Sequence, residues 1–303
     1  MKPLHLYLML ALSLLVACNN AKKESSEGND YTVNAAINDS AEHPKITALK
    51  QFIDSCDSAD VSSVSAVTAH FTQIFAGQTT GLCDTAYVVF QNFYDSVDVH
   101  INDSLQNDTL DYAAMMEAPK PSKQLKDFKK KLAANGFRLV NSSGAVYIEQ
   151  DRSYVSKNFY PLLSDSMKVY LDEIKLESEQ GFALDEQISI TPDKLVNRVI
   201  WYEKFIAGNP KFLFLTNCKN FRKAYLTYLV NGYGKSVLYS DNATKELSAY
   251  FTEAYAYLLK TFPQSETAVL LQPYIDALLQ KQTQKANEQR KTFVIKGLIY
   301  NLE

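Results

Sequence analysis

The residue types that most often do chemistry are sparse in this chain, and their spacing matches no common site. Its 4 histidines are scattered, and no two of them fall at the spacing of a zinc site. Asp98, His100 and Asp103 could converge on a cation, but the segment that follows lacks the glycine of a calcium-binding loop. We therefore predict no catalytic residue, no metal site and no cofactor.

Phosphate-binding and nucleophile motifs are incomplete as well. Residues 232–236 end in Gly-Lys-Ser, but the earlier glycine and the preceding strand of a phosphate-binding loop are missing. No serine lies in a Gly-x-Ser-x-Gly turn. Glu173 and Glu177 lie one helical turn apart, but exposed helix faces often carry such pairs. An enzyme is therefore the least favoured of the functional classes considered below.

Composition narrows the class of protein. The chain has 303 residues, of which 46% are hydrophobic, so it is long enough for one large or two small domains. Its 31 basic and 34 acidic residues give a net charge of -3, and no Lys/Arg stripe of the kind that a nucleic-acid binder needs is present. With only 10 Gly but 19 Tyr and 16 Phe, the composition favours helices with an aromatic core.

The N-terminus carries the strongest motif. An apolar stretch from Leu4 to Val16 is too short to cross a bilayer and ends in Leu15-Val16-Ala17-Cys18. This sequence resembles the lipobox of bacterial lipoproteins. The resemblance implies that residues 1–17 are a signal peptide, that cleavage occurs between Ala17 and Cys18, and that Cys18 is acylated.

The lipobox also predicts where the protein lives. Acyl chains on Cys18 would bind the membrane permanently, because each buried methylene contributes about 0.8 kcal/mol. Asn19, where inner-membrane lipoproteins carry Asp, implies the outer membrane of a Gram-negative bacterium; the periplasmic and the surface face both remain open. Residues 18–43 are polar and lack apolar periodicity, so we predict a flexible tether.

Seven triplets read Asp, then Ser or Thr, then a small or aliphatic residue, whereas about one is expected by chance. They resemble the O-glycosylation sequon that one large group of Gram-negative bacteria uses on envelope proteins. Helix capping by Asp and Ser is the alternative explanation. The acceptor positions would be Ser40, Ser58, Thr85, Ser96, Ser104, Thr109 and Ser166.

Besides Cys18, whose thiol the acyl chain would occupy, the mature chain has three cysteines, namely Cys56, Cys83 and Cys218. An oxidising envelope permits one disulfide, and Cys56 with Cys83 is the nearer pair in sequence. The alternative is that all three are small buried apolar residues.

From residue 44 onward, apolar residues recur mostly at helical spacing. We therefore predict a mainly α fold of stacked helical hairpins over residues 44–303. The polar segment 102–121 is a candidate boundary between two subdomains. The clearest predicted helices lie near 49–53, 61–76, 87–101, 123–134, 164–174, 192–208 and 247–262. We interpret Lys126, Lys129, Lys130 and Lys131 as the solvent-exposed face of their helix. One small β-hairpin is predicted near 137–149, where alternating apolar residues flank a glycine turn.

The C-terminal half aligns with itself at an offset of 53 residues, which pairs Tyr202 with Tyr255 and Pro210 with Pro263. In both copies an amphipathic helix ends before a proline and a second helix follows. Residues 257–265 resemble the helix junction of tetratricopeptide-like repeats in envelope lipoproteins, which implies an architecture only. Pro273 should kink the second helix of the second copy.

These observations favour a non-catalytic, lipid-anchored binding or scaffold protein that holds an envelope protein or peptide on a helical-hairpin surface. The alternative is a lipoprotein that captures a small molecule or glycan by stacking on Trp201, Tyr202, Tyr233 and Tyr239. A capture protein should have a closed pocket with exposed rings, and a scaffold should have an open apolar surface. An envelope enzyme is the third hypothesis.

Overall fold

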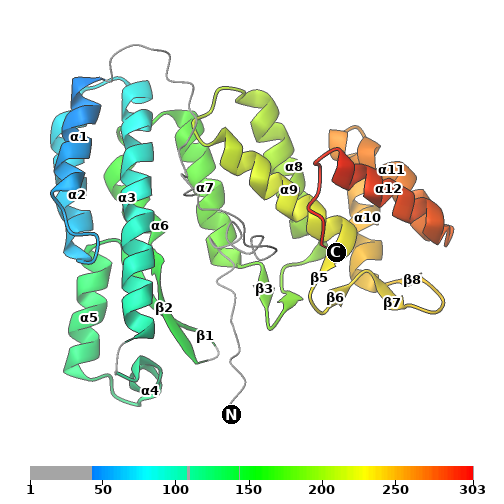
Figure 1. The fold of residues 1–303 in the computed structure, drawn as a ribbon, viewed down its shortest axis with the longest axis horizontal. Helices are drawn as coiled ribbons and strands as arrows, with labels where there is room; N and C mark the ends of the chain where they lie inside the picture. Colours follow the sequence, from blue (N-terminus) through cyan, green and yellow to red (C-terminus); the bar gives the residue numbers. More distant parts are fainter. Residues whose placement is uncertain (1–42, 108–109, 143, 303) are drawn as a thin grey trace, which may run out of the picture. The chain divides into compact units, whose positions relative to one another are not determined.

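The computed structural model describes residues 43–107, 110–142 and 144–302 (Figure 1). Within them lie twelve α-helices and four two-stranded antiparallel hairpins, which confirms the predicted mainly α fold. The described chain divides into two compact units, the first ending at Leu176 and the second beginning at Glu177. This division falls outside the polar segment 102–121 that we considered for a break.

The first unit begins where the helical periodicity begins. The side chain of His43 caps its first helix, because His43 Nδ1 accepts a hydrogen bond from the backbone N–H of Lys45 at 3.2 Å. The elements of this unit are α1 (Pro44–Asp54), α2 (Ser62–Phe75), α3 (Thr80–Gln106), α4 (Tyr112–Glu117), α5 (Lys123–Ala134), β1 (Phe137–Ser142), β2 (Ala145–Gln150), α6 (Arg152–Phe159) and the main part of α7 (Asp165–Gln180).

Aromatic side chains form the core of the first unit. Phe159 is fully buried at the end of α6, and its ring centroid lies 4.3 Å from that of Phe90, 5.0 Å from that of Phe71 and 5.3 Å from that of Tyr87. Each such ring contributes about 1.5–3 kcal/mol by burial. This cluster joins α2, α3 and α6, so helices separated in sequence share one core.

The predicted β-hairpin is present as β1 and β2, which pair with Leu139 opposite Ile148 and Val140 opposite Tyr147. Gly136 precedes it at φ +81, where a Cβ would collide with Tyr154 and with the Tyr94 hydroxyl. The Tyr94 hydroxyl also donates a hydrogen bond to the Gly136 carbonyl. The predicted left-handed end of α5 is thus a close packing position as well.

The second unit contains five complete helices and three short hairpins. Its elements are the last turn of α7, then β3 (Ala183–Leu184), β4 (Gln187–Ile188), α8 (Pro192–Gly208), α9 (Leu215–Asn231), β5 (Gly232–Tyr233), β6 (Ser236–Val237), β7 (Tyr239–Asp241), β8 (Glu246–Leu247), α10 (Ala249–Thr261), α11 (Glu266–Leu279) and α12 (Thr283–Ile295).

Both copies of the 53-residue pattern are helical hairpins, α8 with α9 and α10 with α11. The aligned residues Tyr202 and Tyr255 are buried in their respective first helices. Helix α8 packs against α9 and also against α10 and α11, so the two hairpins stack. Helix α11 runs through Pro273 as one helix.

A carboxylate joins the two stacked hairpins. Glu203 of α8 accepts hydrogen bonds from the backbone N–H groups of Glu266 and Thr267, each at 2.9 Å, at the N-terminus of α11. Its Oε2 also accepts from the Thr267 hydroxyl at 2.6 Å and lies 3.5 Å from Arg222 Nη2 of α9. Because a carboxylate stabilises a helix N-terminus, Glu203 fixes the position of α11 on α8.

Candidate functional site

Several predicted sites lie outside the described residues. They are Ala17, Cys18, Ser40 and Thr109. Signal cleavage, acylation and the predicted tether therefore remain predictions.

The three cysteines are free thiols, so the predicted bridge between Cys56 and Cys83 is not formed in this structure. Each sulfur has its own neighbour: Cys56 Sγ donates to the Phe52 carbonyl at 3.3 Å, and Cys83 Sγ to the Phe75 carbonyl at 3.8 Å. Cys83 and Cys218 are fully buried, and burial raises the pKa of both thiols. Protonated, buried thiols of this kind act as small apolar core residues.

The described Asp-Ser/Thr triplets lie in different backbone contexts. Thr85, Ser96 and Ser104 lie inside α3, and Ser166 lies in the first turn of α7. Ser58 lies in the turn between α1 and α2 and is partly exposed. A glycan needs an accessible acceptor, and among the described candidates Thr85 and Ser104 are exposed on α3, whereas Ser58 is the candidate that lies in a turn.

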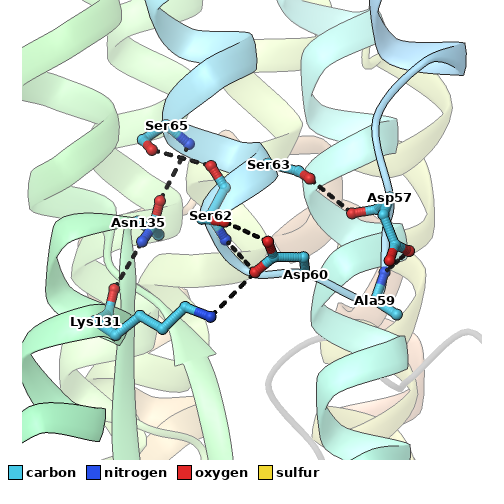
Figure 2. Close-up of polar contacts among 8 residues, drawn as sticks. All are labelled: Asp57, Ala59, Asp60, Ser62, Ser63, Ser65, Lys131 and Asn135. Carbon is cyan, nitrogen blue, oxygen red and sulfur yellow. Dashed lines mark hydrogen bonds and ion pairs between the residues drawn. The ribbon is translucent and has the colours of Figure 1, made fainter.

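Hydrogen bonds fix the backbone on both sides of Ser58 (Figure 2). The Asp57 carboxylate accepts from the backbone N–H of Ala59 at 2.8 Å, and the Asp57 carbonyl accepts from the Ser63 hydroxyl at 2.7 Å. Asp57 thus forms an Asx turn, which is the structural use of Asp that competes with the sequon explanation. Ser58 lies between the two residues that the hydrogen bond from Ala59 to Asp57 joins.

The next acidic residue, Asp60, begins α2 and also holds α5 (Figure 2). Its carboxylate accepts from the Ser62 hydroxyl at 2.5 Å and from the Ser62 backbone N–H at 3.1 Å, and it lies 3.1 Å from Lys131 Nζ. The hydrogen bonds from Ser62, followed by the one from Lys131, lower the pKa of Asp60 to about 2. Asn135, just after α5, adds a second link by accepting from the Ser65 backbone N–H at 3.4 Å.

The side chains of His70 and His100 make contacts within the fold. His70 stacks on Phe52 with ring centroids 4.1 Å apart, and His100 Nδ1 lies 2.8 Å from the Ser96 carbonyl in the preceding turn of α3. In the part of the chain that the structure describes, no three His, Cys, Asp or Glu side chains converge as metal ligands would.

The four aromatic residues of the capture hypothesis lie in two groups. Tyr202 is fully buried in α8, beside the partly exposed Trp201, with ring centroids 4.9 Å apart. Tyr233 and Tyr239 are partly exposed on β5 and β7. Tyr202 is therefore a core residue, and only Tyr233 and Tyr239 belong to the hairpins.

The three hairpins of the second unit gather at one end of its helices (Figure 1). We call β3–β4 and β5–β6, residues 183–188 and 232–237, the hairpin platform. Two bonds join its halves: Lys235 N–H donates to the Glu186 carbonyl at 2.8 Å, and Ile188 N–H donates to the Ser236 hydroxyl at 3.0 Å. The glycines that resembled part of a phosphate loop are thus turn residues. A Cβ on Gly234 would collide with the Glu186 carbonyl.

The platform combines backbone strain with exposed apolar side chains. Asp185 and Glu186 both have left-handed backbones, with φ of 50 and 63, although such two-residue turns prefer Asn and Gly. Leu184, next to this turn, is 56% exposed, and Val237 on β6 is 52% exposed. Two aliphatic side chains therefore face solvent on a rigid pair of hairpins.

Sequence reasoning missed a polar stripe on α3, formed by Gln91, Asp95, Asp98 and Asn102, which faces β2. Gln91 Nε2 donates to Asp95 at 2.6 Å, and Asn102 Nδ2 donates to Asp98 at 2.7 Å. Asn102 also binds both the N–H and the carbonyl of Ile148, as a neighbouring strand would. The signal was available as polar residues spaced 4, 3 and 4 apart on one side of α3.

Burial raises the pKa of both carboxyl groups of this stripe. Burial raises the pKa of Asp95, although a hydrogen bond from Gln150 opposes this effect. Burial, with the nearby charges of Asp95 and Glu149 and against that of Arg152, raises the pKa of Asp98 to about 7. A stripe of this kind can store a proton near neutral pH, and its hydrogen bonds attach α3 to β2.

We expect Asp98→Asn to raise the free energy of unfolding above pH 7 by about 2 kcal/mol. This is about half of the value that the full pKa change would give, and we halve it because Asp98 is partly exposed and solvent screens its charge. Between its unfolded value of 3.8 and about 7, only the folded state holds this proton, so the stability of the native protein falls as pH rises through this range. Urea unfolding at pH 5 and pH 8 measures the difference. Asp103→Asn, at an exposed position of the same helix, is the control, and an unchanged pH slope in Asp98→Asn would contradict the assignment.

A buried arginine forms the second polar cluster that sequence reasoning missed. Arg198 of α8 is only 3% exposed, and its Nη2 donates to the Gly181 carbonyl at 2.7 Å. Its Nη1 donates to the Tyr225 hydroxyl at 3.2 Å, and that hydroxyl donates to Glu177 Oε2 at 2.7 Å. Burial raises the pKa of Tyr225 well above its usual value, so the neutral phenol connects the cation to the carboxylate. This geometry is that of a structural network.

An open hollow of about 500 Å³ lies at the start of α12, lined by Gln282–Lys285 and Glu288. Its lining is polar and includes none of the four aromatic residues. Among the described helices, none combines the length and the apolar character needed to cross a bilayer. Comparison of the chain with family models, curated proteins and solved structures finds no match.

Proposed function

We propose that this protein is a non-catalytic, lipid-anchored binding protein of the outer membrane, which holds a protein or peptide partner of an envelope assembly. The lipobox Leu15-Val16-Ala17-Cys18 supports the anchor, and Asn19 supports the outer membrane. The polar residues between Cys18 and α1 support a tether that lets the helical units reach a partner.

The observation that carries the binding role is the hairpin platform. Leu184 and Val237 are aliphatic, exposed and presented by two hairpins that hydrogen bonds hold together. A rigid surface loses little conformational freedom when a partner covers it, and burial of two aliphatic side chains contributes about 1.5–3 kcal/mol for each. We therefore place the partner on the end of the second unit where these hairpins gather.

The capture of a small molecule or glycan is the weaker proposal. Of its four aromatic residues, Tyr202 is fully buried. Tyr233 packs on Phe182 and Tyr228, and Lys245 lies 5.0 Å from the Tyr239 ring centroid. These contacts occupy ring faces and edges that a stacking ligand would need. The exposed aliphatic side chains of Leu184 and Val237 therefore favour a macromolecular partner.

Photocrosslinking in intact cells tests the binding role. A photoreactive residue placed at Leu184 or Val237 should give a discrete protein adduct that mass spectrometry identifies as an envelope protein. The matched control is Val269 of α11, which is 63% exposed in the same unit but lies away from the platform residues in sequence. Equal labelling from all three positions, or a bound sugar or metabolite without a protein adduct, would refute the scaffold role.

Cys18→Ser should leave an uncleaved or soluble precursor, because the serine hydroxyl cannot replace the thiol in lipobox acylation. Membrane fractionation and the intact mass of the purified protein measure the two effects. The control is Cys56→Ser, which removes a partly exposed thiol of the first unit. Normal processing and unchanged membrane association of the Cys18 variant would mean that the lipobox interpretation is wrong.

A further inference from the structure

Helix α5 concentrates positive charge in a chain whose net charge is negative. Residues 120–131 contain six Lys and one Asp, a local charge of +5, whereas the whole chain has a net charge of -3. The segment contains no Arg. The charge is therefore local, and its source is a run of lysines.

The fold displays these lysines on a fixed helix. Leu125 and Leu132 are buried on its inner side, and Lys123, Lys126 and Lys130 are exposed at spacings of 3 and 4 on the opposite side. The Ser122 hydroxyl caps the helix by accepting from the Leu125 N–H at 3.1 Å. Figure 2 shows how Lys131 and Asn135 attach the helix to the start of α2.

Acidic partners do not neutralise the outward face. In the described part of the chain, Lys131 is the α5 lysine that forms an ion pair, and its partner is Asp60. Lys123, Lys126, Lys129 and Lys130 take part in no ion pair among the described residues. Four exposed cations thus lie on one helix with a single acid, Asp127, among them, and this local excess of positive charge attracts external anions.

Apolar side chains are partly exposed on and just before the helix that packs against α5. Helix α4 packs on α5 through Tyr112 and Phe128, whose ring centroids are 5.3 Å apart. Met115 and Met116 of α4 are partly exposed, and Leu110 just before it is 37% exposed. Lysines next to accessible apolar side chains are the combination found on surfaces that bind membrane interfaces.

We propose that the face formed by α4 and α5 lies against an anionic phospholipid surface. Specific phosphate or carboxylate sites favour arginine, whose planar group binds two oxygens at once, whereas lysine acts as a mobile point charge suited to a diffuse layer of headgroups. The outward face of α5, where exposed lysines surround the single acidic residue Asp127 and no arginine is present, fits the second case. The inference rests on the proposed anchor, because acylated Cys18 brings the chain to such a surface.

Lysine labelling on vesicles tests the proposal. The full chain, purified with its anchor, is reconstituted with excess vesicles of phosphatidylcholine alone or mixed with phosphatidylglycerol, and mass spectrometry measures the rate at which each lysine reacts with an amine reagent. Lys123, Lys126, Lys129 and Lys130 should react about fivefold more slowly on the anionic vesicles. About 0.5 M salt should restore their rates, because it screens charges over a few ångströms.

Helix α12 provides the matched control, since Lys285 and Lys291 are also exposed. Their rates should be the same on both vesicles. In the triple variant Lys123→Glu, Lys126→Glu, Lys130→Glu, the remaining Lys129 should lose its protection, whereas Lys285→Glu with Lys291→Glu should leave α5 protected. Circular dichroism checks that each variant folds.

Two results would overturn the proposal. The first is that the α5 lysines react at equal rates on neutral and anionic vesicles, as expected if the partner of α5 is an acidic protein. The second is that the α12 lysines are protected in place of the α5 lysines. Retention on pure phosphatidylcholine tests the anchor separately. If the chain does not stay on pure phosphatidylcholine vesicles, the proposed anchor is wrong. The lysine reaction rates measured with an excess of anionic vesicles still show whether α5 binds an anionic surface.

Discussion

Leu258→Asp is expected to lower the free energy of unfolding by more than about 4 kcal/mol, because it places a carboxylate inside the contact between the stacked hairpins. Leu258 is fully buried in α10, and α10 packs against both α8 and α11. The new carboxylate must either remain buried without a partner or open the interface. Circular dichroism during urea unfolding measures the loss of helix.

Two variants separate the effect of charge burial from that of lost volume. Leu258→Ala should cost about 2–5 kcal/mol, the range for a buried leucine that leaves a cavity. Val269→Asp introduces the same carboxylate at a position that is 63% exposed in α11, and it should change stability by less than about 0.5 kcal/mol. Equal effects of Asp at positions 258 and 269 would show that the stacked-hairpin packing is wrong.

Apolar periodicity predicted the helices because their burial follows one face. Tyr87, Phe90, Tyr94 and Val97 are all buried in α3, as their spacing indicates. Helix α4 was missed because only Tyr112 of its six residues is buried, and so short an element provides less than two turns of pattern. Helix α6 has Val155 and Phe159 in its core but likewise spans only eight residues.

The hairpin platform could not be predicted from alternation. Strands β3 and β4 have two residues each, too few to establish a period of two. Their turn uses Asp185 and Glu186 in left-handed conformations, so the usual Asn or Gly signal is absent. Lys235 offsets the strain of these two left-handed residues, because its N–H donates to the Glu186 carbonyl and its Nζ donates to the Asp185 carbonyl at 3.0 Å. These tertiary contacts, which alternation cannot reveal, connect the turn to β5–β6.

The buried polar clusters were invisible for a related reason. Gln91, Asp95 and Asn102 are ordinary polar residues in the sequence, and their role depends on β2, about 50 residues further along the chain, lying against α3. The apolar pattern of α3 places them beside its core face, but it does not identify the strand that faces them. Partner identity is a property of the tertiary fold.

Arg198→Leu should lower the free energy of unfolding by about 3–5 kcal/mol, because removing one member of a buried ionic network leaves the others without compensation. The variant would remove the donors to the Gly181 carbonyl and to the Tyr225 hydroxyl, and with them the positive charge that balances the nearly buried Glu177. Arg198→Lys should recover only part of this loss, because one ammonium group cannot reach both acceptors with the geometry of a guanidinium.

A double-mutant cycle tests whether Tyr225 connects the two charges. Tyr225→Phe alone should cost about 1–3 kcal/mol, since it removes the donor to Glu177 and the acceptor for Arg198. If the three residues form one network, the cost of Arg198→Leu with Tyr225→Phe is smaller than the sum of the single costs by at least about 0.5 kcal/mol. Glu203→Gln provides a control pair with Arg198→Leu, because Glu203 acts at the N-terminus of α11 and none of its bonds involves Arg198. If the losses in unfolding free energy of Arg198→Leu and Tyr225→Phe simply add, the two residues form independent hydrogen bonds and the network interpretation is wrong. If these two substitutions are coupled and Arg198→Leu with Glu203→Gln is not, the network is the contact that fixes α8 and α9 to the end of α7.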